Sequence, residues 1–206
     1  MQIRFPSFLT GILLTLSLLA PIKAFAADVL VWGDSLSAAY SMPVENGWVA
    51  LMGKELEPYG LEIANGSVSG EITANGLARL PAALNRHKPQ LVVLELGAND
   101  GLRGMNLKQM HRNLEQMIVL SQQVGAKVLL LGMRIPPNYG PRYSSQFKQI
   151  YEDLSESQNI SLIEFFLANV FSKNHLMQAD NLHPNEDAQP ILVNVIWPKV
   201  QSLLFD

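Results

Sequence analysis

Short apolar runs alternate along the chain with stretches in which apolar residues return every three or four positions. The runs are typical of buried strands, and the helical spacing between them is typical of amphipathic helices. The run over 91–96 is almost entirely apolar, as expected for a central strand covered on both faces. The pattern predicts strands over residues 29–32, 61–64, 91–96, 127–133 and 160–163.

The stretches between these runs carry helix start and stop signals. Asn106 with Gln109 resembles a capping box, and Gly125 is typical of a helix end. Pro81 is expected to interrupt its helix, and Pro198 is expected to kink the last one. We predict helices over residues 43–57, 72–87, 106 to the stop at 125, 143–158 and 187–204. Strands alternating with helices favour an α/β fold, in which a parallel sheet lies between two helix layers.

The N-terminal segment differs from the rest of the chain. Arg4 precedes an apolar run over residues 8–20, and small residues follow at Ala24 and Ala26. This is the pattern of a secretory signal peptide over residues 1–26, with a mature protein that begins at Ala27. A membrane anchor is the alternative, but the run is shorter than the roughly 20 residues that a span needs. Residues 27–206 show no linker or repeat, and we expect them to form a single domain.

Composition narrows the class of protein. The 206 residues are 48% hydrophobic and 16% charged, which is typical of a globular chain. A net charge of −3 gives no support for a nucleic-acid partner. The chain has no Cys, which excludes thiol chemistry, disulfides and Cys metal sites, and which is compatible with the periplasm.

Polar and Gly-rich stretches follow the predicted strands. In a parallel sheet the carboxyl ends of the strands share one edge, where ligands bind. We therefore expect one site, built from residues 33–37, 65–70, 97–100, 134–140 and 180–185.

Within these stretches Ser35 can act as a nucleophile if a base takes its proton. Of the four histidines, His183 has Asp180 three residues before it, a spacing that can bring the carboxylate to the ring. Gly70 and Asn99 can supply donors to an oxyanion. Taken singly, each of these residues is equally typical of a turn or a packed loop. No G-x-S-x-G elbow occurs in the chain.

Four sequence blocks occur in a fixed order: GDSLS at 33–37, VSGE around Gly70, GAND at 97–100 and DNLHP at 180–184. Together they resemble the SGNH family of hydrolases, also called GDSL esterases. Further stretches, among them ELGANDGLRG and NLHPNEDAQP, are similar to the family's bacterial periplasmic thioesterases, which are multifunctional arylesterases and lysophospholipases. Ala98 stands where close relatives often have Gly.

The resemblance implies a role for each residue of the blocks. Ser35 would be the nucleophile, His183 the general base and Asp180 its orienting acid. The oxyanion hole would consist of the Ser35 and Gly70 N–H groups and the Asn99 side chain. The implied fold is a three-layer α/β/α sandwich, flavodoxin-like, with a five-stranded parallel sheet in the order 2-1-3-4-5. For Asp34 we expect a turn or hydrogen-bonding role.

The expected function is that of an exported serine hydrolase that cleaves acyl esters and thioesters without metal or cofactor. Its partner would be a small acyl ester, thioester or lysophospholipid, and a monomer is the default state. A carbohydrate O-deacetylase and a non-catalytic flavodoxin-like binding module are the alternatives; neither a G-x-G-x-x-G motif nor a P-loop occurs. Residues near the polar blocks can line an acyl pocket or simply pack the core: Leu36, Leu102, Met105, Ile135, Pro136, Pro137 and Tyr139.

Overall fold

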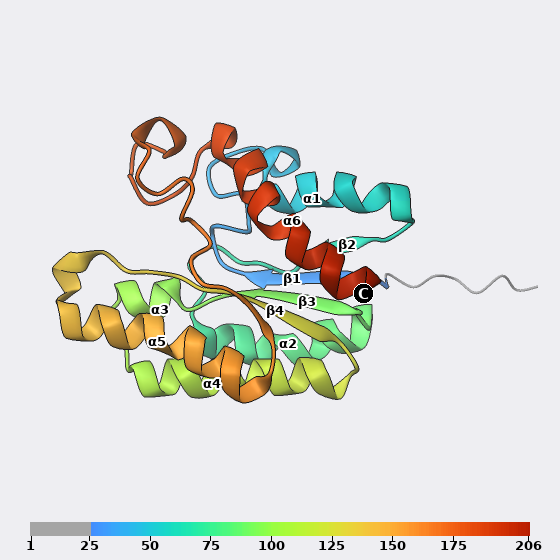
Figure 1. Ribbon diagram of the computed structural model, residues 1–206, viewed down its shortest axis with the longest axis horizontal. Coiled ribbons are helices and arrows are strands. Elements are labelled where there is room, and N and C mark those ends of the chain that lie inside the picture. The colour runs from blue at the N-terminus through green and yellow to red at the C-terminus, as the bar shows by residue number, and fades with distance from the viewer. Residues whose placement is uncertain (1–25) are drawn as a thin grey trace, which may run out of the picture.

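A parallel sheet forms the centre of the molecule. The computed structural model describes residues 26–206 (Figure 1). All of the predicted signal peptide except its last residue lies outside the described residues. The sheet has five strands in the order β2-β1-β3-β4-β5, which confirms the expected fold class and strand order. The strands are β1 (Val29–Gly33), β2 (Ile63–Asn65), β3 (Leu91–Glu95), β4 (Lys127–Leu131) and β5 (Ser161–Ile163).

Helices cover both faces of this sheet. Figure 1 shows α1 (Trp48–Leu56) and α6 (Gln189–Phe205) on one face, and α2 (Thr73–His87), α4 (Leu107–Gln123) and α5 (Pro141–Gln158) on the other. The chain winds from β1 to β2 over one face and then from β2 through β5 over the opposite face. The direction of winding therefore reverses beside β1, and the crevice that binds ligands in such sheets opens at the carboxyl ends of β1 and β3.

The core is continuous from the sheet into both helix layers. Every residue of β1 and of β3 is buried, because helices cover both faces of these two central strands. Large side chains such as Trp32, Trp48, Phe147, Tyr151 and Phe166 fill the space between the layers. One charged side chain, Glu95, belongs to these fully buried strands and lies at the carboxyl end of β3.

Two predicted helices differ from those observed. The helix expected over 43–57 is divided, because Gly47 has extended backbone angles (φ −70°, ψ 151°) between a single 3-10 turn (Val44–Asn46) and α1. The expected interruption at Pro81 is wrong, since α2 continues through it to His87. Packing of the apolar face of α2 against α4 and β1 stabilises the helix despite the missing N–H of Pro81.

The start of α4 shows how one side chain fixes a helix boundary. Asn106 Oδ1 accepts hydrogen bonds from the N–H groups of Lys108 (2.9 Å) and Gln109 (3.2 Å). Only this half of the expected capping box forms, because the Gln109 side-chain oxygen accepts from Arg112 (2.5 Å), while its NH₂ group donates to Asn113 (2.8 Å). Two of the unpaired N–H groups of the first turn are thereby satisfied.

Replacing this cap should destabilise the fold. We expect Asn106→Ala to lower the free energy of unfolding by about 1 kcal/mol, because the Lys108 N–H loses its acceptor and the Gln109 N–H keeps only the Asn106 carbonyl (3.0 Å). Asn106→Asp is the matched control, since Asp caps helices as well as Asn does. Urea denaturation measures both variants, and equal stability of the two would contradict a capping role for Asn106.

Candidate active site

Ser35 follows β1 at the point where the strand ends in a turn. Gly33 is the last residue of β1, and a Cβ built on it would lie only 2.6 Å from Glu95 Oε2 and 2.7 Å from Ser37 Oγ. A larger residue here would require the Glu95 carboxyl group and the Ser37 hydroxyl to move. The turn after Ser35 closes through the N–H of Ala38, which donates to the Asp34 carbonyl (3.0 Å). Ser35 is therefore held at the carboxyl edge of the sheet, over the crevice.

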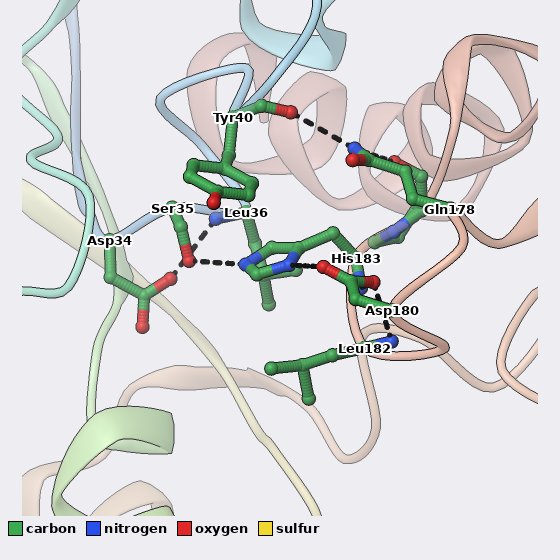
Figure 2. A network of polar contacts seen from close by, with 9 residues as sticks. Asp34, Ser35, Leu36, Tyr40, Gln178, Asp180, Leu182 and His183 are labelled. Atoms are coloured by element: carbon green, nitrogen blue, oxygen red, sulfur yellow. Dashed lines mark hydrogen bonds and ion pairs between the residues drawn. The ribbon is translucent and has the colours of Figure 1, made fainter.

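The structure brings Asp180 and His183 together within one turn and places them next to Ser35 (Figure 2). His183 Nε2 lies 2.9 Å from Ser35 Oγ, and His183 Nδ1 lies 2.7 Å from Asp180 Oδ2. The other carboxylate oxygen accepts the N–H groups of Leu182 (2.9 Å) and His183 (3.0 Å). The three-residue spacing of Asp and His thus forms a turn that carries its own carboxylate acceptor.

The charge of Asp180 follows from these contacts. Burial by itself raises its pKa, but hydrogen bonds from the His183 N–H, the His183 ring and the Leu182 N–H outweigh this and lower the pKa to about 2. Asp180 is therefore ionised at neutral pH. A neutral His183 then carries its proton on Nδ1, facing Asp180, and leaves Nε2 free to accept from the Ser35 hydroxyl.

Gln178 joins the histidine turn to the serine turn. Its backbone N–H donates to the His183 carbonyl (2.7 Å), and its side-chain amide donates to the carbonyls of Tyr40 (2.9 Å) and Pro184 (3.1 Å). The Tyr40 ring lies over the His183 ring, with centroids 4.5 Å apart (Figure 2). These contacts hold a loop from late in the chain against the turn after β1.

The two remaining predicted donors, Gly70 and Asn99, line the same cavity as Ser35. Asn99 lies in the short helix α3 (Ala98–Leu102), and its side-chain amide donates to Asp34 Oδ2 (2.9 Å). Gly70 has a φ of +78°, which a side chain rarely adopts. Its carbonyl accepts a hydrogen bond from Arg103 (2.9 Å), so that carbonyl is engaged and turned toward Arg103.

Buried polar contacts hold the elements that carry Gly70 and Asn99. Asp100, the neighbour of Asn99, accepts the N–H (2.9 Å) and the hydroxyl (2.6 Å) of Thr73, the first residue of α2. Arg79 forms an ion pair with Glu71 and lies over the Trp32 ring, 4.2 Å from its centroid. The start of α2 is therefore joined to α3 on one side and to β1 on the other.

Two carboxyl groups lie behind the serine turn. Glu95 Oε2 accepts the Ser37 hydroxyl (2.8 Å) and the Asp34 N–H (3.2 Å), while Oε1 is buried without a hydrogen-bond partner among residues 26–206. Burial, followed by the charge of Asp34, raises the pKa of Glu95 well above its ordinary value. Burial also raises the pKa of Asp34 to about 6, although hydrogen bonds from Leu36 and Asn99 oppose this. The charge of Asp34 thus favours the protonated form of Glu95.

The buried Glu95 carboxyl group beside Asp34 should make the free energy of unfolding depend on pH. Because the folded pKa of Glu95 lies above its unfolded value near 4.5, its contribution to stability is complete below pH 4.5 and is lost as pH rises through the folded pKa. Glu95→Gln does not titrate. We expect its stability relative to wild type to increase with pH, by up to about 1.4 kcal/mol per pH unit.

Chemical denaturation between pH 4.5 and 9 measures this difference. Glu55→Gln, at an exposed position of α1, is the matched control and should show no such trend. A constant difference between Glu95→Gln and wild type across this range would show that the folded protein carries an ionised Glu95.

A largely apolar cavity of about 240 Å³ opens beside Ser35 and His183. Among its polar groups are Ser69 and Arg134, whose guanidinium lies 4.8 Å from the centroid of the Phe165 ring. Most of the wall consists of apolar side chains: Leu36, Ala98, Leu102, Met133, Pro136, Phe165, Leu167, Phe171 and Leu182. Such a wall accommodates an acyl chain better than a sugar.

Three of the predicted pocket residues, Leu36, Leu102 and Pro136, line this cavity, and two do not. The Ile135 side chain is buried against Gly101 in the core. The Tyr139 hydroxyl donates to the Leu102 carbonyl (2.6 Å), and this exposed residue lies outside the lining.

The other two candidates add nothing to the lining. Met105 is exposed and lies outside it, and the Pro137 side chain lies outside the described part.

Sequence reasoning missed most of the apolar wall. Met133 follows β4 and Phe165 follows β5, so the rule that places a site after strand ends could have found them. Phe171 carries no such signal, whereas Leu182 lies within the stretch 180–185 that the sequence assigns to the site. His87, His111 and His175 do not line the cavity.

Residues 26–206 contain neither a metal-ligand cluster nor a membrane-spanning helix. No group of three metal-ligating side chains occurs in this part of the chain. No helix in it is long and apolar enough to cross a membrane.

Comparison with known proteins agrees with this geometry. The model of the GDSL-like Lipase/Acylhydrolase family matches residues 31–189. The chain is 48% identical over 184 residues to Esterase TesA of Pseudomonas aeruginosa, which covers 88% of this chain and 92% of that protein. It is 40% identical over 183 residues to Thioesterase 1/protease 1/lysophospholipase L1 of Escherichia coli strain K12, covering 88% of each.

A solved structure gives the same result. The psychrotrophic esterase EstA from Pseudoalteromonas sp., in a crystal structure inhibited by monoethylphosphonate, has a TM-score of 0.82 and 40% identity, covering 86% of this chain and 98% of that one. These matches confirm the resemblance to the SGNH hydrolases: the chain belongs to the GDSL-like Lipase/Acylhydrolase family and is an enzyme of its esterase class.

Proposed function

We propose that the protein is an exported serine hydrolase that cleaves acyl esters and thioesters through an acyl-enzyme. The observation that carries this proposal is the 2.9 Å contact between Ser35 Oγ and His183 Nε2 at the mouth of an apolar cavity. A nucleophile in contact with a base, which is itself oriented by a carboxylate, is the arrangement that acyl transfer needs.

The first half of the reaction forms the acyl-enzyme. Ser35 Oγ attacks the carbonyl carbon as His183 Nε2 takes its proton, and Asp180 stabilises the imidazolium. The oxyanion accepts hydrogen bonds from the N–H groups of Ser35 and Gly70 and from the Asn99 amide. The tetrahedral intermediate then collapses, the bond to the alcohol or thiol breaks, and His183 returns its proton to that leaving group.

The second half releases the acid. Water enters, His183 takes a proton from it, and the hydroxide attacks the acyl carbon. The same donors hold the oxyanion. Collapse breaks the bond to Ser35 Oγ, which takes the proton back from His183. The cycle is balanced with one water consumed, and no step requires an added electron acceptor or metal.

The cavity wall supports an acyl chain as the recognised part of the substrate. Hydrocarbon side chains make up most of it, and burying each CH₂ group of a chain contributes roughly 0.8 kcal/mol. The relatives named esterase and thioesterase/lysophospholipase support esters, thioesters and lysophospholipids as the substrate class. A carbohydrate O-deacetylase would need no such wall, so this alternative is less well supported.

A panel of p-nitrophenyl esters from acetyl to octanoyl tests the proposal. We expect kcat/KM to increase from acetyl to octanoyl, because a longer chain contacts more of the wall. Ser35→Ala should lose at least about 10³-fold in kcat. Ser172→Ala removes an exposed hydroxyl outside the cavity and is the control. Full activity of Ser35→Ala would rule out the nucleophile, and a preference for acetyl would favour the O-deacetylase.

Export is proposed from the sequence of residues 1–26. When the full chain is expressed in a Gram-negative bacterium, the periplasmic fraction should contain protein that begins at Ala27. Intact-mass measurement of that fraction identifies the new N-terminus. Protein found only in the cytoplasm with residues 1–26 retained would contradict export.

A further inference from the structure

Asp34 is nearly fully buried, with 1% of its surface exposed, and the mechanism above gives it no role. Each of its carboxylate oxygens accepts a hydrogen bond from a different part of the site. Oδ1 accepts the backbone N–H of Leu36 (3.1 Å), which follows the nucleophile. Oδ2 accepts the side-chain amide of Asn99 (2.9 Å), which follows β3. One carboxylate therefore connects the serine turn to the predicted oxyanion donor.

The contact with Asn99 constrains the orientation of its amide group. An asparagine amide has two N–H groups and one carbonyl oxygen, and these exchange places when the group flips. An acceptor on one N–H fixes both the plane of the amide and its nitrogen side. Within residues 26–206, Asp34 is the only residue that accepts a hydrogen bond from the Asn99 side chain. The second N–H remains available to a bound substrate.

We propose that Asp34 is a positioning residue, which holds the Asn99 amide so that its second N–H donates to the oxyanion of the substrate. This inference rests on the proposed function. Asp34 itself contacts neither the reacting carbonyl nor the leaving group. Its effect passes through Asn99, and preorganised donors of this kind are effective because they need no reorientation during the reaction.

A carboxylate suits this position better than an amide does. Leu36 and Asn99 both present N–H donors, and a carboxylate offers an acceptor to each. An asparagine has a single acceptor oxygen, so its NH₂ group would oppose one of the two donors. The Asn99 amide would then lose its partner or flip to present its carbonyl to the position of Asp34.

Glu95, at the carboxyl end of β3, in turn fixes the position of Asp34. Its backbone N–H donates to Glu95 Oε2 (3.2 Å), which also accepts the Ser37 hydroxyl. Gly33, the residue before Asp34, pairs with Glu95 in the register of β1 and β3. The strand pairing therefore sets the distance between Asp34 and the helix that begins after β3 and carries Asn99.

A double-mutant cycle tests the proposal, with kcat measured on saturating p-nitrophenyl octanoate. Asn99→Ala should lower kcat by roughly 10²–10³-fold, the usual loss for one oxyanion donor. Asp34→Asn should lower kcat by about 10–10²-fold with KM changed less than about threefold, because a misplaced donor affects the transition state most. In the Asn99→Ala background, Asp34→Asn should have an effect of less than about threefold.

Asp28→Asn is a matched control. Asp28 also accepts one backbone N–H, from Glu62 (2.9 Å), and one side-chain amide, from Gln90 (2.7 Å), but at the opposite end of β1. This variant should retain wild-type kcat. A loss of kcat in Asp28→Asn equal to that in Asp34→Asn would assign the effect to general destabilisation and overturn the proposal.

Independent, multiplying losses in the cycle would also overturn it, because Asp34 would then act through the serine turn and not through Asn99. This outcome leaves the proposed function intact as long as wild type is active and Ser35→Ala is not. Conversely, an inactive wild type would reject the proposed function itself.

The wild-type protein supplies a second measurement if Asp34→Asn does not fold. In a ¹H–¹⁵N spectrum at pH 8, the two Asn99 side-chain protons should have separate, slowly exchanging signals. Reaction of Ser35 with a phosphonate ester, which leaves a negative oxygen in the oxyanion position, should shift mainly the proton that does not face Asp34. Two signals with the shifts of free asparagine would overturn the proposal.

Discussion

The close approach of β1 and β3 at their carboxyl ends is the constraint on which the site depends. The two strands pair in register from Val29 with Leu91 to Gly33 with Glu95, and both are buried on both faces. At the last pair any Cβ on Gly33 would overlap the Glu95 carboxyl group and the Ser37 hydroxyl, so a larger residue would force these side chains to move. The absence of a side chain at Gly33 brings the serine turn within hydrogen-bonding distance of the α3 helix. A wider separation would leave Asn99 without its contact to Asp34.

This approach places two carboxyl groups in a region with little water, which is unfavourable for folding. The protein offsets part of this cost with donors: the Ser37 hydroxyl and Asp34 N–H for Glu95, and the Leu36 N–H and Asn99 amide for Asp34. Glu95 is fully buried and has a partner on only one oxygen, so its protonated form is favoured, and the charge of Asp34 adds to this preference. An arrangement that lowers stability while organising donors is typical of functional sites.

The sequence predicts the sheet well, because each strand is an apolar run bounded by turn residues, and the strand order follows from the family resemblance. It predicts the polar half of the site for a related reason, since Ser35, Gly70 and Asn99 all follow strand ends. The apolar wall is different: Phe171 has the same pattern as a core residue, and only the path of the chain after β5 brings it to the cavity, whereas Leu182 lies within the polar stretch 180–185. The contacts of Glu95 could not be predicted either. An acidic residue in an apolar run does not reveal which group its carboxyl will face in the folded protein.

The two halves of the site are held in different ways, and this division explains why the histidine turn carries its own carboxylate. Ser35, Gly70 and Asn99 follow three adjacent strands, so the hydrogen-bonded sheet fixes their separation. His183 comes from a long segment after β5, attached to the serine turn mainly through Gln178 and the Tyr40 ring. If the carboxylate that accepts from His183 Nδ1 belonged to the sheet, each displacement of the segment that carries His183 would weaken this hydrogen bond. The ring would then lose the contact that fixes its tautomer. Because Asp180 lies in the same turn, a displacement changes only the distance from Nε2 to Ser35.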